Sequence, residues 1–146
     1  MNMNERPVFP RRAVITAGMP YGNKELHFGH IGGVFIHADV FARFLRDRIG
    51  EDNVIFVSGT DCYGSPILES YRKWKEQSDS TLSIEDYVKL NHQKQKEALE
   101  KYQISLNLYG ASALDRSKEV HTKVSDEIFE ALYRKGYLQK RSTPQF

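Results

Sequence analysis

The alternation of hydrophobic and polar positions along the chain predicts strands and helices in the order of an α/β fold. Residues 13–18 form a short, continuous apolar run, which predicts a buried strand. From His27 the apolar residues recur at helical spacing to Ile49, and their density in the first half predicts a deeply packed helix that stops at Gly50. Residues 53–57 form a second apolar run, typical of a buried parallel strand. Strand, helix and strand in this order predict a right-handed crossover in an open parallel sheet.

The rest of the chain continues this alternation. We expect helices over 65–77, 83–102 and 115–135, a half-buried strand over 104–109 and the start of a final strand at 137–138. The second of these helices carries many charges beside a narrow apolar stripe, so it is expected to lie on the outside. The third has several apolar residues on one face, which predicts that this face is packed.

Composition places the chain among single-domain proteins with one core. Its 146 residues, 40% of them hydrophobic and 27% charged, are ordinary for such a domain. No apolar run reaches the roughly 18 residues of a membrane span, and the N-terminus does not resemble a signal peptide, so we expect a cytoplasmic protein without membrane contact. The single cysteine excludes an intrachain disulfide, and a net charge of +2 is too small to indicate nucleic acid by itself.

The most informative stretch, residues 19–30, lies between the first strand and the first helix. A turn rich in Pro, Gly and Asn leads into a helix that opens on His27, Gly29 and His30. The N–H groups and the dipole at a helix start favour a phosphate, and the two histidines share one face of the first turn. Gly29 lets a nucleotide approach the backbone. A metal-binding pair and a purely structural role are the alternatives, the first disfavoured because zinc needs further ligands.

A carboxylate is expected to face the same crevice. The second apolar run is followed by Gly59, Thr60 and Asp61. Ligands of open parallel sheets bind at the carboxyl ends of the strands, so Asp61 should lie near His27 and His30. The structural alternative for Asp61 is a turn former or a helix cap.

These motifs resemble one family. Residues 20–30 are similar to the histidine motif of class I aminoacyl-tRNA synthetases, residues 38–44 to the continuation of its helix, and residues 59–67 to a second conserved block. Together they resemble the N-terminal part of the catalytic domain of methionyl-tRNA synthetases, over residues 13–146, with residues 1–12 as a loose arm. The resemblance implies a Rossmann-like nucleotide-binding fold with a parallel sheet, of which this chain holds the first half.

The resemblance also implies a reaction, the ATP-dependent activation of methionine to methionyl-adenylate for tRNA charging. ATP, with Mg²⁺, would be a substrate, and no zinc site is expected in this chain. His27 and His30 would be the catalytic residues, because they would donate hydrogen bonds to phosphate oxygens as charge moves to pyrophosphate. Gly29 and Gly32 would complete the ATP site.

For methionine, the resemblance implies that Asp61 holds the ammonium group and that Met19, Pro20 and Tyr21 line the thioether pocket. Ordinary core packing is the alternative for Met19 and Tyr21. Where the family usually has Glu-His after the aspartate, this chain has Cys-Tyr at 62–63. A cysteine at this place is also found in isoleucyl-tRNA synthetases, which keeps the amino-acid specificity open.

The larger departure from the family is what the chain lacks. The connective domain, the zinc knuckle, the Lys-Met-Ser-Lys-Ser loop and the anticodon-binding domain are all missing from the sequence, so the chain alone is expected to be inactive or only partly active. A second chain or self-association would complete the site, and tRNA would bind only then. The alternatives are a non-catalytic module that binds methionine or a nucleotide, and a small nucleotidyltransferase with the same histidine motif.

Overall fold

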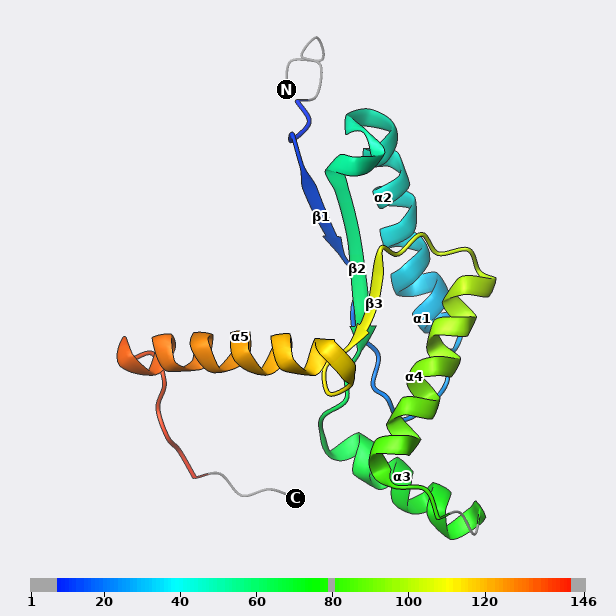
Figure 1. Ribbon diagram of the computed structural model, residues 1–146, viewed down its shortest axis with the longest axis vertical. Coiled ribbons are helices and arrows are strands. Elements are labelled where there is room, and N and C mark those ends of the chain that lie inside the picture. Colours follow the sequence, from blue (N-terminus) through cyan, green and yellow to red (C-terminus); the bar gives the residue numbers. More distant parts are fainter. Residues whose placement is uncertain (1–7, 79–80, 143–146) are drawn as a thin grey trace.

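A three-stranded parallel sheet forms the centre of the molecule. The computed structural model describes residues 8–78 and 81–142, so most of the expected N-terminal arm lies outside the described residues. The strands are β1 (Ala13–Thr16), β2 (Val54–Thr60) and β3 (Leu108–Ala111), in the order β1-β2-β3 (Figure 1). The predicted parallel sheet and α/β class are confirmed.

One long helical run connects β1 to β2. It consists of α1 (Phe28–His30), a π-helical turn η1 (Ile31–Phe35) and α2 (Ile36–Ile49). It ends at Gly50, whose φ of +96° suits glycine, and the short 3-10 turn η2 (Glu51–Asn53) leads into β2. The helix predicted from His27 to Ile49 is confirmed, with a π turn that the periodicity did not indicate.

Three further helices agree with the predicted ranges to within two residues. They are α3 (Ser65–Ser78), α4 (Ile84–Lys101) and α5 (Asp115–Arg134). The hydroxyl of Ser83 accepts the N–H of Asp86 at 3.1 Å, which caps α4 as predicted. In Figure 1, α4 runs beside the α1 end of the long helical run, whereas α5 projects away from the rest of the fold.

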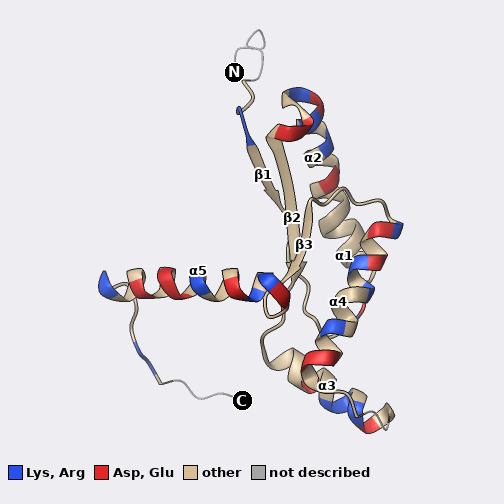
Figure 2. Cartoon of the chain, in the orientation of Figure 1, with Lys and Arg blue, Asp and Glu red and all other residues tan. Residues whose placement is uncertain are grey.

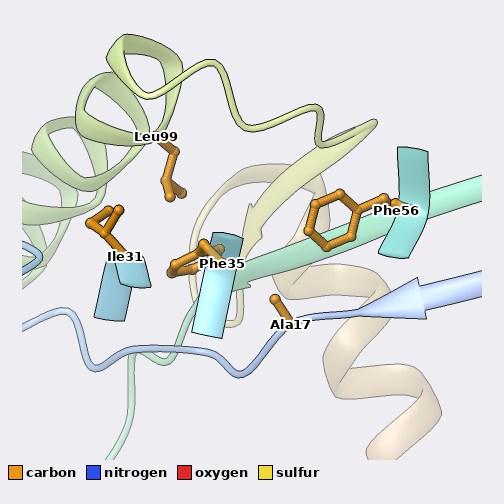
Figure 3. Close-up of a cluster of buried hydrophobic side chains, with 6 residues drawn as sticks. Ala17, Ile31, Phe35, Phe56 and Leu99 are labelled. Atoms are coloured by element: carbon orange, nitrogen blue, oxygen red, sulfur yellow. The ribbon is translucent and has the colours of Figure 1, made fainter. Parts of the chain in front are cut away.

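The core lies between one face of the sheet, the long helical run and α4. Figure 3 shows side chains from all three converging, and the buried cluster consists of Ala17, Ile31, Phe35, Ala42, Phe56 and Leu99. Other apolar residues of the first half of this run, Phe28 and Ile36, are 84% and 40% exposed. The expectation that its first half is packed all round is therefore wrong, because a helix lying on one face of a sheet buries one stripe only.

The strand expected over 104–109 is wrong in its bounds, since β3 begins only at Leu108. The residues before it form a loop whose backbone groups are bonded by side chains of α2. Asp39 accepts the N–H of Ser105 at 2.7 Å, and Arg46 donates to the carbonyl of Ser105 at 3.1 Å. Ser105 therefore has no backbone group left for a strand ladder.

Two apolar surfaces remain open. No residue of α5 is buried, so the apolar face expected to be packed is exposed. The sheet is covered on one face only, which also corrects the expectation that β2 is fully buried, since its Ile55 is half exposed. Residues 137–138 lie in an irregular segment instead of the expected strand. Within residues 8–78 and 81–142, the structure contains no helix with the length and hydrophobicity of a membrane span.

Candidate functional site

The histidine motif forms the start of the long helical run. His27 is the N-cap residue of α1, with extended backbone (φ −114°, ψ 172°), and its Nδ1 accepts the N–H of Gly29 at 3.1 Å. Nδ1 of His30 in turn accepts the N–H of His27 at 3.2 Å. The two imidazole rings lie together with their centroids 3.8 Å apart. Each ring thus satisfies a backbone donor that the helix start would otherwise leave unpaired.

These bonds assign the tautomer of both histidines. A nitrogen that accepts a hydrogen bond carries no proton, so each neutral ring has its proton on Nε2. Within the described residues neither Nε2 has a hydrogen-bond partner. Burial, followed by the charges of His27 and Lys24, lowers the pKa of His30 below its ordinary value, which keeps that ring neutral near pH 7.

The two glycines of the predicted ATP site have different surroundings. A Cβ on Gly29 would stand 2.9 Å from Cε1 and 3.0 Å from Nδ1 of His27, so glycine is needed for the His27 ring to reach its capping position. The sequence suggested room for a nucleotide as the reason. A Cβ on Gly32 would meet nothing within 4 Å. The ATP-binding roles of both glycines stay predictions.

The residues predicted to line the thioether pocket surround one cavity with His30. The cavity has a volume of about 240 Å³, and Met19, Pro20, Tyr21 and His30 are among its lining residues. Met19 and Tyr21 are 48% and 45% exposed, which argues against the alternative of ordinary core packing. The structure therefore brings the methionine candidates and one phosphate candidate together.

Asp61 lies next to the same loop, but its side chain turns to its own segment. Asp61 and Tyr21 form a parallel bridge beyond the ends of β2 and β1, with the N–H of Asp61 2.8 Å from the carbonyl of Pro20. Its Oδ1 accepts the N–H of Tyr63 at 3.1 Å. Within the described residues, no hydrogen bond or ion pair joins this carboxylate to His27 or His30. Its geometry is that of a turn former, and its role toward the ammonium group stays a prediction.

Three side chains of α4 hold the loop that leads into the histidine motif, and the sequence pattern predicted this role for none of them. We call Tyr87, Asn91 and Gln95 the α4 clamp. Its hydrogen bonds run from Gln95 Nε2 to Tyr21 O (2.9 Å) and Lys24 O (2.8 Å), from Asn91 Nδ2 to Gly22 O (3.2 Å), and from Tyr87 Oη to Asn23 O (2.6 Å). Asn91 and Gln95 follow Tyr87 at four-residue intervals, so the sequence places all three on one face of the helix. Amide side chains on a highly charged helix do not stand out as buried, however, so the hydrophobic pattern could not predict their role.

The structure shows what surrounds Cys62, the first residue of the Cys-Tyr pair that replaces the family's usual Glu-His. Cys62 packs against the cluster of Ile67, Tyr87 and Val88, and its N–H bonds to Ser112 Oγ at 2.9 Å. This agrees with a small packed side chain. In the described part of the chain, no three His, Cys, Asp or Glu side chains gather as a metal site would require.

A parallel sheet, a βαβ crossover and a histidine pair where the helix leaves the carboxyl end of β1 define a Rossmann-like nucleotide-binding fold. The site lies where ligands of such folds bind. Comparison with known proteins then gives the family: the chain belongs to the class I tRNA synthetases of the methionine type, since the family model "tRNA synthetases class I (M)" matches residues 13–146.

Individual relatives agree with this family. The methionine–tRNA ligase of Cytophaga hutchinsonii is 35% identical over 137 residues, which are 94% of this chain and 18% of that protein. The one of Pyrococcus furiosus is 36% identical over 92% of this chain and 17% of its own length. The solved structure of Mycobacterium tuberculosis methionyl-tRNA synthetase in complex with methionyl-adenylate has the same fold, with a TM-score of 0.68 over 84% of this chain and 21% of that chain at 24% identity. The chain thus spans under a fifth of the length of these curated relatives.

Proposed function

We propose that this chain forms the histidine-motif half of a methionine-activating site, in which methionine and ATP give methionyl-adenylate and pyrophosphate ahead of tRNA charging. The observation that carries the proposal is the imidazole pair of His27 and His30, which lies at the start of the 28–49 helical run, with His30 lining the cavity that Met19 and Tyr21 also line. The family and the adenylate held by the related structure support the choice of reaction. A cytoplasmic location is part of the proposal.

The reaction is a displacement at phosphorus. A carboxylate oxygen of methionine bonds to the α-phosphorus of ATP, the bond to the bridging oxygen breaks, and pyrophosphate leaves with the charge. His27 and His30 would donate their Nε2–H groups to the phosphate oxygens on which charge develops. The loss of one such donor costs about 2.7–4 kcal/mol, roughly a hundred- to a thousand-fold in rate. Mg²⁺, which accompanies ATP, would neutralise part of the triphosphate charge.

Methionine would lie against the loop after β1. Met19 and Tyr21, both half exposed at the cavity, supply soft and aromatic contacts suited to a thioether, and Pro20 fixes the backbone between them. Asp61 would receive the ammonium group after its side chain leaves the N–H of Tyr63.

The chain also presents a surface that further polypeptide would cover. Val14, Ile55 and Leu108 are 67%, 50% and 56% exposed, and the strand register puts them on the same face of the sheet. An adjoining groove of about 570 Å³ includes Leu108, Val120 and other residues of α5. Figure 2 shows no charged residue on the strands.

We infer that the remaining part of the synthetase, in the same or in a second chain, packs on this face and supplies the groups that neutralise the triphosphate. Contiguous exposed apolar side chains of this kind are typical of protein–protein interaction sites. The edge strands β1 and β3 are further places where a second chain would pair. Charging of tRNA would require that same addition.

Methionine-dependent exchange between ATP and labelled pyrophosphate tests the proposal. We expect little exchange by the chain alone, exchange when a polypeptide corresponding to the rest of the relatives is added, and its loss in the His30→Ala variant. His37→Ala, on an exposed position of α2, is the matched control and should keep the activity. A His30→Ala variant as active as this control would refute the phosphate role.

The same assay separates the alternatives. Robust exchange by the isolated chain would show that the lysine loop is dispensable. Thermal stabilisation by methionine without exchange, about 2.7 kcal/mol at a hundredfold excess over Kd, would identify a binding module instead. Exchange with isoleucine in place of methionine would change the assigned substrate.

A further inference from the structure

The α4 clamp bonds every carbonyl of residues 21–24, the loop that carries the chain from the methionine candidates to the histidine motif. Four consecutive carbonyls bonded by side chains of one other helix leave this loop little freedom. The loop also packs closely against α4, because a Cβ on Gly22 would come within 2.9 Å of Val88 on that helix. The position of the loop is therefore set by α4, and not by its own turn residues alone.

Gln95 is the centre of the clamp. It is fully buried, and all four hydrogen-bonding positions of its amide are used. Its Nε2 donates to the carbonyls of Tyr21 and Lys24, and its Oε1 accepts the hydroxyls of Thr60 (2.8 Å) and Tyr109 (2.9 Å). Because carbonyls only accept, the amide has one possible orientation. Gln95 thus ties the loop to the end of β2 and to Tyr109 within β3.

A histidine outside the motif completes this arrangement. Nδ1 of His92 lies 2.8 Å from Thr60 Oγ1, and its ring stacks on Tyr109. Since the single hydroxyl proton of Thr60 goes to Gln95, Nδ1 of His92 must be the donor. His92 therefore holds its proton on Nδ1, opposite to His27 and His30.

We propose that Gln95, with Asn91 and Tyr87, is a positioning residue that sets where the donors of His27 and His30 stand relative to the cavity of Met19 and Tyr21. The effect passes from Gln95 through the carbonyl of Lys24, three residues before His27. This inference rests on the proposed function for its purpose, but the geometry it asserts can be measured without any reaction.

Two substitutions test the clamp with matched controls. Gln95→Glu keeps the oxygen that accepts the two hydroxyls but replaces the NH₂ group that holds the loop with a second acceptor oxygen. Gln93→Glu adds the same charge at an exposed position of the same helix, where Gln93 bonds only to Glu97 in the structure. Tyr87→Phe removes one hydroxyl bond with almost no change in shape. Its control is Tyr71→Phe, because the Tyr71 hydroxyl bonds to a carbonyl outside the loop.

The primary measurement is the NMR signal of the imidazole nitrogens in the free chain, which reports the tautomer of each ring. We expect the wild type and both controls to show His27 and His30 protonated on Nε2 and His92 on Nδ1. Gln95→Glu and Tyr87→Phe should move the signals of His27 and His30 toward averaged tautomers. ATP affinity, measured by calorimetry, should fall about three- to tenfold in Tyr87→Phe and further in Gln95→Glu.

Unchanged imidazole signals of His27 and His30 in a folded Gln95→Glu or Tyr87→Phe chain would overturn the proposal, even if thermal stability fell, because a merely structural role predicts that outcome. If Gln95→Glu does not fold, Tyr87→Phe decides. A wild-type chain that binds no ATP would show that this half of the site needs the rest of the synthetase for binding, while the imidazole signals would still decide the positioning.

Discussion

At the scale of single residues, the backbone of the first helical turn decides which nitrogen of each imidazole holds a proton. Nδ1 of His27 and Nδ1 of His30 accept N–H groups, so a cationic ring would lose its bond to the helix start. The neutral rings keep Nε2–H as a donor. A phosphate is therefore offered donors that the fold itself has oriented, and protonation would disturb the helix start at the same time.

Replacement of Gly29 by Ala should damage the site more than the same change at Gly32. The new Cβ would meet the ring of His27 at 2.9 Å, so the ring must turn away and the cap is lost, at about 0.5–2 kcal/mol. Gly32 has open space, and Ala there should stabilise the helix by about 0.5–1 kcal/mol. Thermal unfolding and ATP titration of both variants measure this. Equal effects of the two changes would contradict the capping role of His27.

Acid should destabilise the fold through His30 and His92. Burial is the largest cause that lowers the pKa of each, neighbouring positive charges act in the same direction, and Asp115 opposes them at His92. The unfolded chain, with a pKa near 6.5, then binds more protons just below that pH, so the free energy of unfolding should fall as the pH drops through this window. Urea unfolding at about pH 7.5 and about pH 5.5 measures the change, and His92→Gln should reduce it.

The candidate site was predictable where residues are neighbours in sequence and unpredictable where they meet through the fold. The histidine pair, Met19 and Tyr21 belong to one short stretch, and the structure places them around one cavity or beside it. Asp61 lies at the expected strand end, but its carboxylate accepts the N–H of Tyr63, a bond that the sequence motif does not predict. The role of Gln95 was not predicted, because it depends on which loop α4 packs against, and the sequence does not show that.

At the scale of elements, a buried charge cluster replaces the strand that alternation predicted before β3. Asp39 accepts both the N–H and the hydroxyl of Ser105 and pairs with Arg43 at 2.7 Å. Burial raises the pKa of Asp39, but the bonds from Ser105 and Arg43 outweigh it and the pKa is lowered overall. Alternation of apolar and polar residues over 104–109 carries no information about such partners, so the pattern favoured a strand.

Removal of the Asp39 carboxylate should therefore loosen the connection into β3. We expect Asp39→Ala to cost about 2–3 kcal/mol, because the half-buried N–H and hydroxyl of Ser105 lose their acceptor. Asp47→Ala, at an exposed position on the same helix, should stay within about 0.5 kcal/mol. Urea unfolding compares the two. If Asp39→Ala lowers the free energy of unfolding no more than Asp47→Ala does, water takes the place of the carboxylate as the acceptor for Ser105.

At the scale of the whole molecule, only one face of the sheet is covered by the helices that the structure describes. Helices cover the inner face of the sheet, and α5 projects from its edge with an exposed apolar face (Figure 1). Periodicity correctly gave β1, β2 and the helices, though not the bounds of β3 or the strand expected at 137–138, and it also indicated that these faces are apolar. It could not indicate that nothing within the described residues covers them, because burial is decided by the partner and not by the pattern.

The isolated chain should self-associate through this open face. We expect Leu108→Lys, on the outer face of the sheet, to shift sedimentation toward the monomer while the circular dichroism spectrum stays unchanged. Leu90→Lys, at an exposed position of α4, should leave the association as it is. A chain that stays monomeric at every concentration, or equal effects of both substitutions, would argue against an adhesive sheet face.

The π turn has a geometric consequence for the long helix. The N–H of Ile36 bonds to the carbonyl of Ile31, five residues back, so this turn holds one residue more than an α turn. One residue corresponds to about 100° of rotation around a helix axis. Deletion of one glycine at 32–33 would restore a regular helix and swing the imidazoles sideways while α2 stayed seated on the sheet. The extra residue thus sets the direction in which the two imidazoles point relative to α2. Insertion or deletion of a residue at this turn would change that direction without moving α2 on the sheet.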